Sequence, residues 1–182
     1  MGIARWKPNA RERLQEVALE LFAERGYEQT TAAEIAARAE LTERTFFRHF
    51  TDKREVLFAG EAAMQAALVA GVADATGDEF VRAGLEAVAD ELEPRRDDLR
   101  RRAALIASHP ALRERELIKQ AATAEVLADA LRERGVAAGE AEVSAEVAIV
   151  LLRVAFDRWL AAGDGSLRER VAEVRGQLVA VR

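Results

Sequence analysis

The sequence predicts an all-α protein of about nine helices, and three observations lead to this fold class. Alanine, leucine, glutamate and arginine, which are all good helix formers, dominate the chain. Apolar residues recur at steps of three and four, whereas the alternation that is typical of strands is nearly absent. Only three prolines occur in 182 residues, and half of the residues are hydrophobic, so few helices are interrupted and a packed core can form.

The first helix is expected to begin after Asn9 and to end at Gly26. Asn9 can cap the helix, and Glu12 stands three residues later, which is the spacing of a capping box. Glycine is the residue that most often follows a helix end. One face of this helix is apolar, and its members are Leu14, Val17, Ala18, Leu21 and Phe22.

Two short helices are expected next, over about 31–39 and 42–50. Thr31 and Glu34 form a second capping box, and Thr42 is a plausible cap for the later helix. Because only two residues separate the helices, they must cross steeply. That arrangement is helix-turn-helix geometry, with the second helix available for recognition.

Phe46 and Phe50 lie four residues apart, so both are expected to fix the second helix of this pair to the core. The opposite side of the helix is polar and basic. The residues left available to a ligand as large as a DNA groove are Thr42, Glu43, Arg44, Thr45, Phe47, Arg48 and His49.

A capping box from Asp52 to Glu55 predicts a long amphipathic fourth helix that ends near Ala75. The remaining helices are expected at about 79–92, 95–108, 111–134, 140–162 and 166–181, between proline- and glycine-containing breaks. The breaks therefore predict a three-helix domain at 1–52, which holds the helix-turn-helix, and a second helical domain at 53–182.

The last two helices are expected to make a homodimer. In the final helix, apolar residues step by four and three, a narrow packing seam that consists of Leu167, Val171, Val174, Leu178 and Val181. The helix at 140–162 is apolar around most of its circumference, which a surface helix of a small monomer could not satisfy. The alternative is that both helices pack only within one chain, since a seam does not distinguish self from partner.

Charge and composition exclude several function classes. The net charge is −5, so any nucleic-acid site must be local, and residues 1–54 carry ten Lys and Arg against nine Asp and Glu. The chain has no cysteine and two well-separated histidines, and we find no phosphate-binding glycine loop or nucleophile elbow. We therefore expect no catalytic residues, no metal site and no cofactor.

The expected location is the cytoplasm. The first residues lack the apolar stretch of a secretion signal, and the longest purely apolar run, 147–152, is far shorter than the ~20 residues that span a bilayer. We expect no membrane partner. Arg5, Trp6 and Lys7 are either a disordered start or an arm that touches the DNA backbone or minor groove.

Gly26 followed by Thr30 and Thr31, then Ile35 and Ala36, then the run at 45–50 and Lys53, resembles the DNA-binding domain of the TetR family of regulators. The resemblance implies that the helix at 42–49 enters the major groove. It also implies groove or phosphate contacts for Thr31, Thr45, Phe47, His49 and Lys53. Base choice would then rest on Glu43, Arg44 and Arg48, since arginine can bind a guanine edge and glutamate can accept from cytosine.

Two positions depart from the family pattern. Glu40 stands where the turn commonly carries glycine, so it either adopts a left-handed conformation or forces a different turn. Phe47 replaces the more usual tyrosine, which removes a hydroxyl contact to phosphate but keeps packing on a thymine methyl or sugar. His49 has an alternative role as a partly buried structural histidine.

A second resemblance concerns the rest of the chain. The stretch at 106–113, together with Phe156 to Leu160, is similar to the C-terminal domain of the MftR-like branch, whose members include acyl-CoA-responsive repressors. It implies an elongated apolar effector pocket, with Phe80, Leu105, Ile106, Phe156 and Trp159 as wall residues. The alternative is that this apolar stripe is plain core, and His109 is expected to be a helix-end residue.

The sequence therefore predicts a homodimeric repressor that binds a palindromic operator in double-stranded DNA and releases it when a small apolar or acyl-type effector binds. Two alternatives stay open. One is activation in place of repression, and the other is a helical ligand-binding adaptor that has lost sequence-specific DNA binding.

Overall fold

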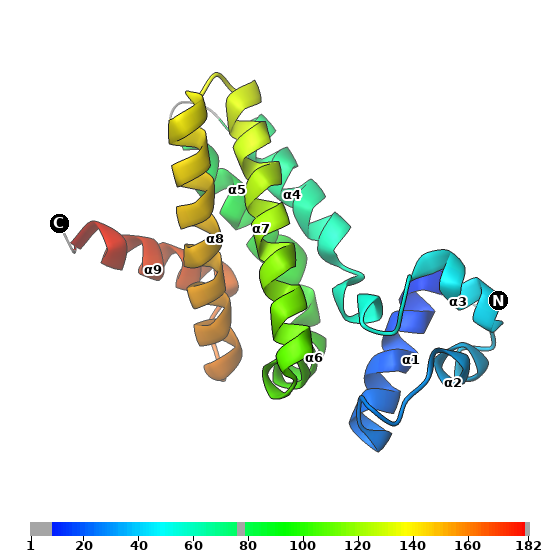
Figure 1. The fold of residues 1–182 in the computed structure, drawn as a ribbon. Helices are drawn as coiled ribbons and strands as arrows, with labels where there is room; N and C mark the ends of the chain where they lie inside the picture. The colour runs from blue at the N-terminus through cyan, green and yellow to red at the C-terminus, as the bar shows by residue number, and fades with distance from the viewer. Residues whose placement is uncertain (1–8, 76–78, 181–182) are drawn as a thin grey trace, which may run out of the picture. The chain divides into compact units, whose positions relative to one another are not determined.

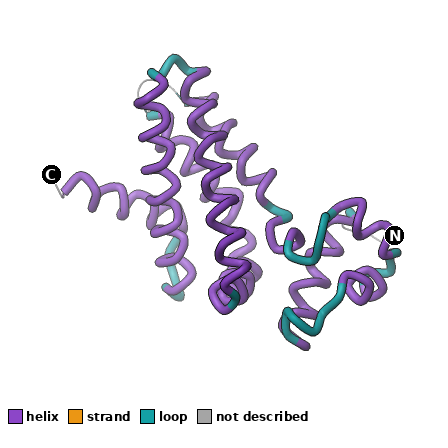
Figure 2. The backbone as a smooth tube through the Cα atoms, in the orientation of Figure 1, coloured by secondary structure: helices purple, strands orange, loops and turns teal. Residues whose placement is uncertain are grey.

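The computed structural model describes residues 9–75 and 79–180, and within these ranges the chain forms helices and no strands. The all-α prediction is confirmed (Figures 1 and 2). The described helices are α1 (Ala10–Arg25), α2 (Ala32–Arg38), α3 (Glu43–His49), η1 (Glu55–Phe58, a 3-10 turn), α4 (Glu61–Asp74), α5 (Phe80–Leu92), η2 (Glu93–Arg95, a 3-10 turn), α6 (Arg96–Ser108), α7 (Pro110–Glu133), α8 (Ala138–Ala161) and α9 (Leu167–Ala180).

The chain divides into two compact units. The first runs to Gly60 and includes Arg101–Ser108, and the second comprises Glu61–Arg100 and the residues from His109 onward. Helix α6 is thus shared, since its first residues belong to the second unit and its last eight to the first. The compact units differ from the predicted domain boundary at 52–53, because η1 and the end of α6 group with the N-terminal helices.

The first unit is built around α1, which begins as the sequence predicts. Asn9 accepts a hydrogen bond from the Glu12 amide at 3.0 Å, and the Glu12 carboxylate accepts from the Asn9 amide at 3.2 Å. The apolar face of α1 faces a core that also receives α2, α3, η1 and the end of α6. The fully or nearly fully buried side chains of this core include Leu14, Ala18, Leu21, Phe22, Ile35, Phe46, Leu57 and Ile106.

The prediction that one long fourth helix follows the capping box at 52–55 is wrong at the start of that helix. Residues 55–58 form the 3-10 turn η1, and α4 begins only at Glu61, after Gly60. Two arginines explain the break. The Arg102 side chain donates to the Leu57 carbonyl at 2.6 Å, and the Arg11 side chain donates to the Ala59 carbonyl at 3.3 Å. These carbonyl oxygens therefore accept from arginine side chains and not from backbone amides of a continuing helix.

The segment Glu55–Asp74 has a mean hydropathy of 1.6 and is long and apolar enough, by composition alone, to cross a membrane. The structure uses its apolar residues differently. Val56 and Leu57 are buried in the first unit, and Leu68 and Val72 are buried in the second, where α4 packs against α5 and α7. The buried share of the segment is 28%, so only part of its apolar surface packs in these cores.

The second unit holds α4 and α5 unusually close together. A Cβ atom at Gly71 would lie 2.6 Å from the Ala83 carbonyl oxygen and 2.8 Å from the Ala87 Cβ. Only glycine permits this approach. Helices α7 and α8 form an antiparallel pair beside them (Figure 1), and α9 packs on α5 and α8.

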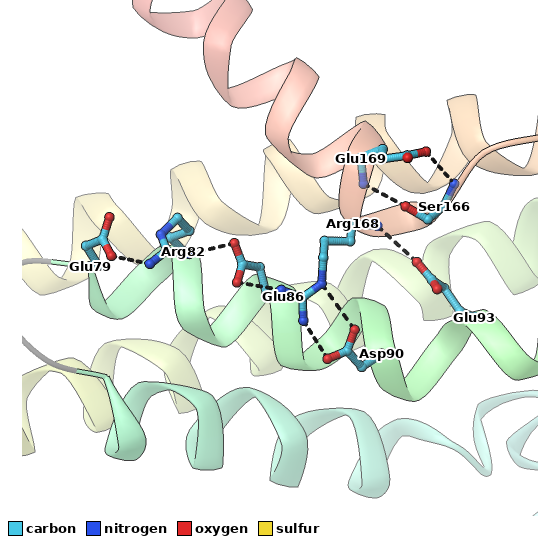
Figure 3. A network of polar contacts seen from close by, with 8 residues as sticks. All are labelled: Glu79, Arg82, Glu86, Asp90, Glu93, Ser166, Arg168 and Glu169. Atoms are coloured by element: carbon cyan, nitrogen blue, oxygen red, sulfur yellow. Dashed lines mark hydrogen bonds and ion pairs between the residues drawn. The ribbon is translucent and has the colours of Figure 1, made fainter.

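The final helix is fastened to α5 by charged side chains. Ser166 and Glu169 form a capping box at the start of α9, with nitrogen-to-oxygen distances of 2.9 and 3.0 Å. Arg168 donates to Glu86 at 2.8 Å and to Asp90 at 2.6 Å, and Arg82 of α5 joins Glu86 to the same network (Figure 3). Helix α9 thus belongs to the fold of a single chain.

The seam expected on α9 is largely used inside the unit. Leu167, Val171 and Val174 are buried, whereas Leu178 is half exposed. Val181 lies outside the described residues. Exposed apolar side chains occur on α8, where Val143, Val147 and Val150 are 64%, 39% and 50% exposed, and on α7, where Leu117 and Ile118 are 63% and 51% exposed.

Candidate nucleic-acid interface

The turn between α2 and α3 sets the direction of the candidate reading helix. Glu40 has a φ of 55°, so it adopts the left-handed conformation that glycine favours. The Leu41 amide donates to the Ala36 carbonyl at 2.9 Å, and the Glu40 amide donates to the Ala37 carbonyl at 3.0 Å. These two bonds form a Schellman motif, which closes α2 in a single turn.

Arg13 of α1 ties this turn to the core, because its guanidinium donates to the Ala39 carbonyl at 2.7 Å. Of the two outcomes that the sequence leaves for Glu40, the left-handed one is observed. Glu40 therefore adopts the backbone conformation that glycine usually has in this turn.

Helix α3 is fixed at both ends and along one face. The Thr42 hydroxyl accepts from the Thr45 amide at 3.1 Å, which confirms the expected cap. Phe46 is fully buried, Phe50 is 3% exposed, and their ring centroids are 5.6 Å apart, as the sequence predicts for the anchors. Arg11 closes the far end by donating to the His49 carbonyl at 3.3 Å and lying over the Phe50 ring.

The outward face of α3 forms a shallow concavity of about 480 Å³, lined by Thr42, Arg44, Thr45, Phe47 and Arg48. Phe47 is 52% exposed, and it is the one large apolar side chain that the described part of the first unit leaves in solvent. Its ring rests edge-on against Phe46 at 5.4 Å between centroids. Residues that sequence reasoning assigned to the reading face are thus brought together here.

The two arginines of this face, Arg44 and Arg48, differ from the other cations of residues 9–60 in their hydrogen bonds and ion pairs. Arg11, Arg13 and Lys53 donate to backbone carbonyls, and the exposed cations Arg25, Arg38 and Arg54 pair with carboxylates. Arg44 and Arg48 are exposed, and within residues 9–60 they alone among the cations have no hydrogen bond or ion pair. Their charge is therefore available to an external anion.

The remaining predicted contact residues surround this face less directly. Thr31 is exposed, and its hydroxyl donates to the Glu34 carboxylate at 2.9 Å. The hydrogen bond from the Thr31 backbone amide, followed by the one from its hydroxyl, lowers the pKa of Glu34. His49 is half-buried, and burial, followed by the charges of Arg48 and Arg11, lowers the pKa of its imidazole. Glu43 is exposed on the first turn of α3.

Lys53 lies apart from the reading face. Its ammonium donates to the carbonyls of Tyr27 at 2.8 Å and Thr30 at 3.1 Å, and it lies 4.3 Å from the centroid of the Tyr27 ring. Sequence reasoning found this residue but missed Arg11 and Arg13, whose contacts depend on the tertiary fold. Arg5, Trp6 and Lys7 lie outside the described residues.

The predicted effector-pocket residues are not gathered in one unit. Leu105 and Ile106 belong to the first unit, and Phe80, Phe156 and Trp159 belong to the second. Trp159 is 1% exposed, lies 5.9 Å from Phe156 between ring centroids, and carries the Arg96 guanidinium over its face. Across residues 9–75 and 79–180, no group of His, Asp or Glu is placed to hold a metal ion.

Comparison with known proteins identifies the family. Residues 14–59 match the family described as bacterial regulatory proteins, tetR family, and residues 76–182 match the MftR C-terminal domain. The chain belongs to the TetR family of transcriptional regulators. The resemblance inferred from the helix-turn-helix motif is confirmed, and the same matches support a regulator in place of an enzyme.

Three relatives of this TetR-family chain are informative. The HTH-type transcriptional regulator TcmR of Streptomyces glaucescens is 45% identical over 62 residues, which are 34% of this chain and only 27% of that protein. FadR of Thermus thermophilus, a TetR-family repressor solved with lauroyl-CoA, is 27% identical over 93% of both chains, with a TM-score of 0.57. SmeT, the repressor of a multidrug efflux pump of Stenotrophomonas maltophilia, is 19% identical over 94% of this chain and 89% of its own, with a TM-score of 0.58, and shows the fold alone.

Proposed function

We propose that this TetR-family chain is a cytoplasmic repressor that binds a palindromic operator as a homodimer and releases it when an apolar or acyl-type effector binds. The observation that carries the DNA-binding part is the outward face of α3. Arg44 and Arg48 have no internal partner there, and they flank the exposed ring of Phe47. A concave surface with unpaired arginines fits a polyanion with apolar methyl groups in its groove.

Each residue of this face has a proposed role. Arg44 and Arg48 donate to guanine edges, Glu43 accepts from a cytosine amine, and Phe47 packs on a thymine methyl or a sugar. Contacts to phosphate are proposed for Thr42 and Thr45, which line the face, and for Thr31 and His49, which lie beside it. In a symmetric dimer the two α3 helices would enter successive major grooves roughly 34 Å apart.

The proposed dimer face is the exposed valine line of α8. Val143, Val147 and Val150 follow one another at steps of four and three, so they share one side of the helix. Leu178 extends exposed apolar surface to α9. A second copy of the chain with the same line would bury both, as a two-fold interface requires.

The proposed effector is apolar or acyl-bearing, and FadR of Thermus thermophilus with its bound lauroyl-CoA supports this class. Of the predicted wall residues, Phe80, Phe156 and Trp159 belong to the second unit and stay the candidates there. Since the chain has two tryptophans, a Trp6→Phe variant reports on Trp159 alone. Titration with lauroyl-CoA should change the fluorescence of Trp159 and release bound operator. If the effector belongs to another class, lauroyl-CoA should cause neither change.

Selection of bound sites from a random DNA library, at one salt concentration, tests the reading face. Wild-type protein should recover one palindrome, and Arg44→Ala and Arg48→Ala should each weaken binding by about 1–3 kcal/mol and relax preference at one position of each half-site. Arg38→Ala is the matched control, since Arg38 is similarly exposed but pairs with Glu24 at 2.7 Å. Equal preference in all four proteins would contradict these roles.

The adaptor alternative makes a different prediction. Wild-type protein would then enrich no sequence, and its binding would be weak and strongly dependent on salt. Ligand binding to the second unit would persist. The same selection therefore separates a regulator from a protein that has lost DNA recognition.

A further inference from the structure

The ammonium of Lys53 is fully engaged inside the first unit. Its nitrogen lies 2.8 Å from the Tyr27 carbonyl oxygen, 3.1 Å from that of Thr30 and 3.3 Å from that of Glu28. An ammonium has three N–H donors, so these three carbonyls can use all of them. The Tyr27 ring adds a cation–π contact at 4.3 Å. We call this arrangement the Lys53 clamp.

The Lys53 clamp holds the loop between α1 and α2. Tyr27 is buried against Phe22, with ring centroids 5.2 Å apart, and this burial raises the pKa of Tyr27 to about 12. Thr30 is 1% exposed, and its hydroxyl donates to the Gly26 carbonyl at 2.9 Å. Thr31, the cap of α2, follows directly. The clamp therefore fixes the chain immediately before the helix-turn-helix.

We infer that Lys53 is a positioning residue for DNA binding, which orients the α1–α2 loop and the start of α2 and does not itself pair with a phosphate. The inference rests on the proposed DNA-binding function and revises one contact within it. A phosphate could gain a hydrogen bond from this ammonium only if a carbonyl lost one. Arg44 and Arg48 have no such internal bonds to break.

Amine labelling of the native protein tests the clamp directly. The chain has three lysines, Lys7, Lys53 and Lys119, so mass spectrometry can follow each one. In the free protein Lys53 should react at least about tenfold more slowly than a fully solvated amine, because its nitrogen is hydrogen-bonded three times. Addition of the selected operator should leave its rate unchanged within twofold. Fast labelling that operator DNA suppresses would overturn the inference and make Lys53 a phosphate contact.

Two variants extend the test to binding. Lys53→Met should speed amide exchange of residues 27–31 at least tenfold and weaken operator binding, and Lys53→Arg should restore part of both. The salt slope of binding should stay that of wild type, whereas loss of a phosphate contact lowers it by about 0.9 per protomer. Arg54→Gln is the matched control. It removes a neighbouring cation that pairs with Asp52 at 2.7 Å, and it should leave loop exchange unchanged.

The outcomes separate this inference from the proposed function. If wild-type protein binds no operator, the proposed function fails and the role of Lys53 in DNA binding fails with it, although labelling and exchange in the free protein still show whether the clamp exists. If wild-type protein binds its operator and the salt slope of Lys53→Met is lower than that of wild type, only the positioning role of Lys53 is overturned.

Discussion

The two units leave different kinds of groups without a partner. Among residues 9–60 of the first unit, most cations bind a backbone carbonyl or a carboxylate, and the exceptions are Arg44 and Arg48 on the outward face of α3. In the second unit, charged side chains of α5 and α9 pair with one another (Figure 3). The second unit also exposes apolar side chains on α7, α8 and α9, which are Leu117, Ile118, Val143, Val147, Val150 and Leu178.

This difference indicates different partners. Surface ion pairs such as those of Arg168 stabilise the packing of α9 by only about 0–1 kcal/mol each. Their charges are paired within the chain, so they do not indicate a binding surface. Unpaired arginines around a concavity favour a polyanion, whereas a line of exposed valines favours another apolar surface. The contrast can be tested by altering each surface and the residues that support it.

The largest effect should come from the residue that supports the reading face. Phe46→Ala removes a fully buried ring and should destabilise the first unit by about 3–5 kcal/mol, with loss of operator binding. Phe47→Ala is the matched variant, since the neighbouring ring is 52% exposed. It should change the free energy of unfolding by less than about 0.5 kcal/mol and still weaken operator binding. Denaturant titration and operator binding measure both, and equal stability losses would contradict the assignment of faces.

The next largest effect should fall on self-association. Val147→Asp and Val150→Asp together place two carboxylates in the proposed interface, and we expect dimer dissociation constants to rise by about 100-fold or more. Sedimentation measures this, and circular dichroism should show an unchanged helical fold because both side chains are exposed in the single chain. Val147→Ile keeps the line apolar and serves as the control. Dimers that survive the double substitution would place the interface elsewhere, and Leu178→Asp would then test α9.

A smaller effect is expected at the turn that aims α3. Glu40 has a φ of 55°, and a left-handed conformation costs a non-glycine residue roughly 1–2 kcal/mol. Glu40→Gly should therefore stabilise the protein by about 1 kcal/mol, after the larger chain entropy of glycine in the unfolded state is subtracted. Thermal unfolding should shift upward by about 2–4 °C. Glu43→Gly, at a helical position, should instead lower stability.

Local features of the fold could be predicted from the sequence because they depend on residues a few positions apart. The caps at Asn9, Thr31, Thr42 and Ser166 are examples, since each uses a hydrogen bond to a residue three positions later. The anchors of α3 were predictable for the same reason. Such patterns survive folding because nothing distant has to be known.

Features that depend on distant residues could not be predicted. The break before α4 comes from Arg11 and Arg102, which lie far from it in sequence and bind the carbonyls of Ala59 and Leu57. The Lys53 clamp likewise joins positions 23 to 26 residues apart. The spacing of apolar residues on α9 predicts a packing surface, but it cannot reveal that Val171 and Val174 pack within one chain.

The smallest expected effect concerns the pH dependence of operator binding. The pKa of His49 is lowered in the free protein by burial and by the cations Arg48 and Arg11, so its imidazole is neutral near pH 7. The unfolded chain binds a proton at His49 more readily than the folded chain does. The contribution of His49 to the free energy of unfolding is therefore present above about pH 6.5 and is lost as the pH falls. A phosphate beside His49 would raise its pKa in the complex, so binding takes up a proton and operator affinity should increase as the pH falls from 8 to 6.

This opposite dependence distinguishes the two roles of His49. A pKa rise of one unit on binding corresponds to about 1.4 kcal/mol per protomer at low pH, and His49→Gln should abolish that gain. The other histidine, His109, provides the matched control, since His109→Gln should keep the wild-type profile. Fluorescence anisotropy with the selected operator, at constant ionic strength, measures these profiles. If the affinity of wild-type protein and His49→Gln changes equally with pH, His49 is a structural histidine and the phosphate contacts beside α3 reduce to the threonines.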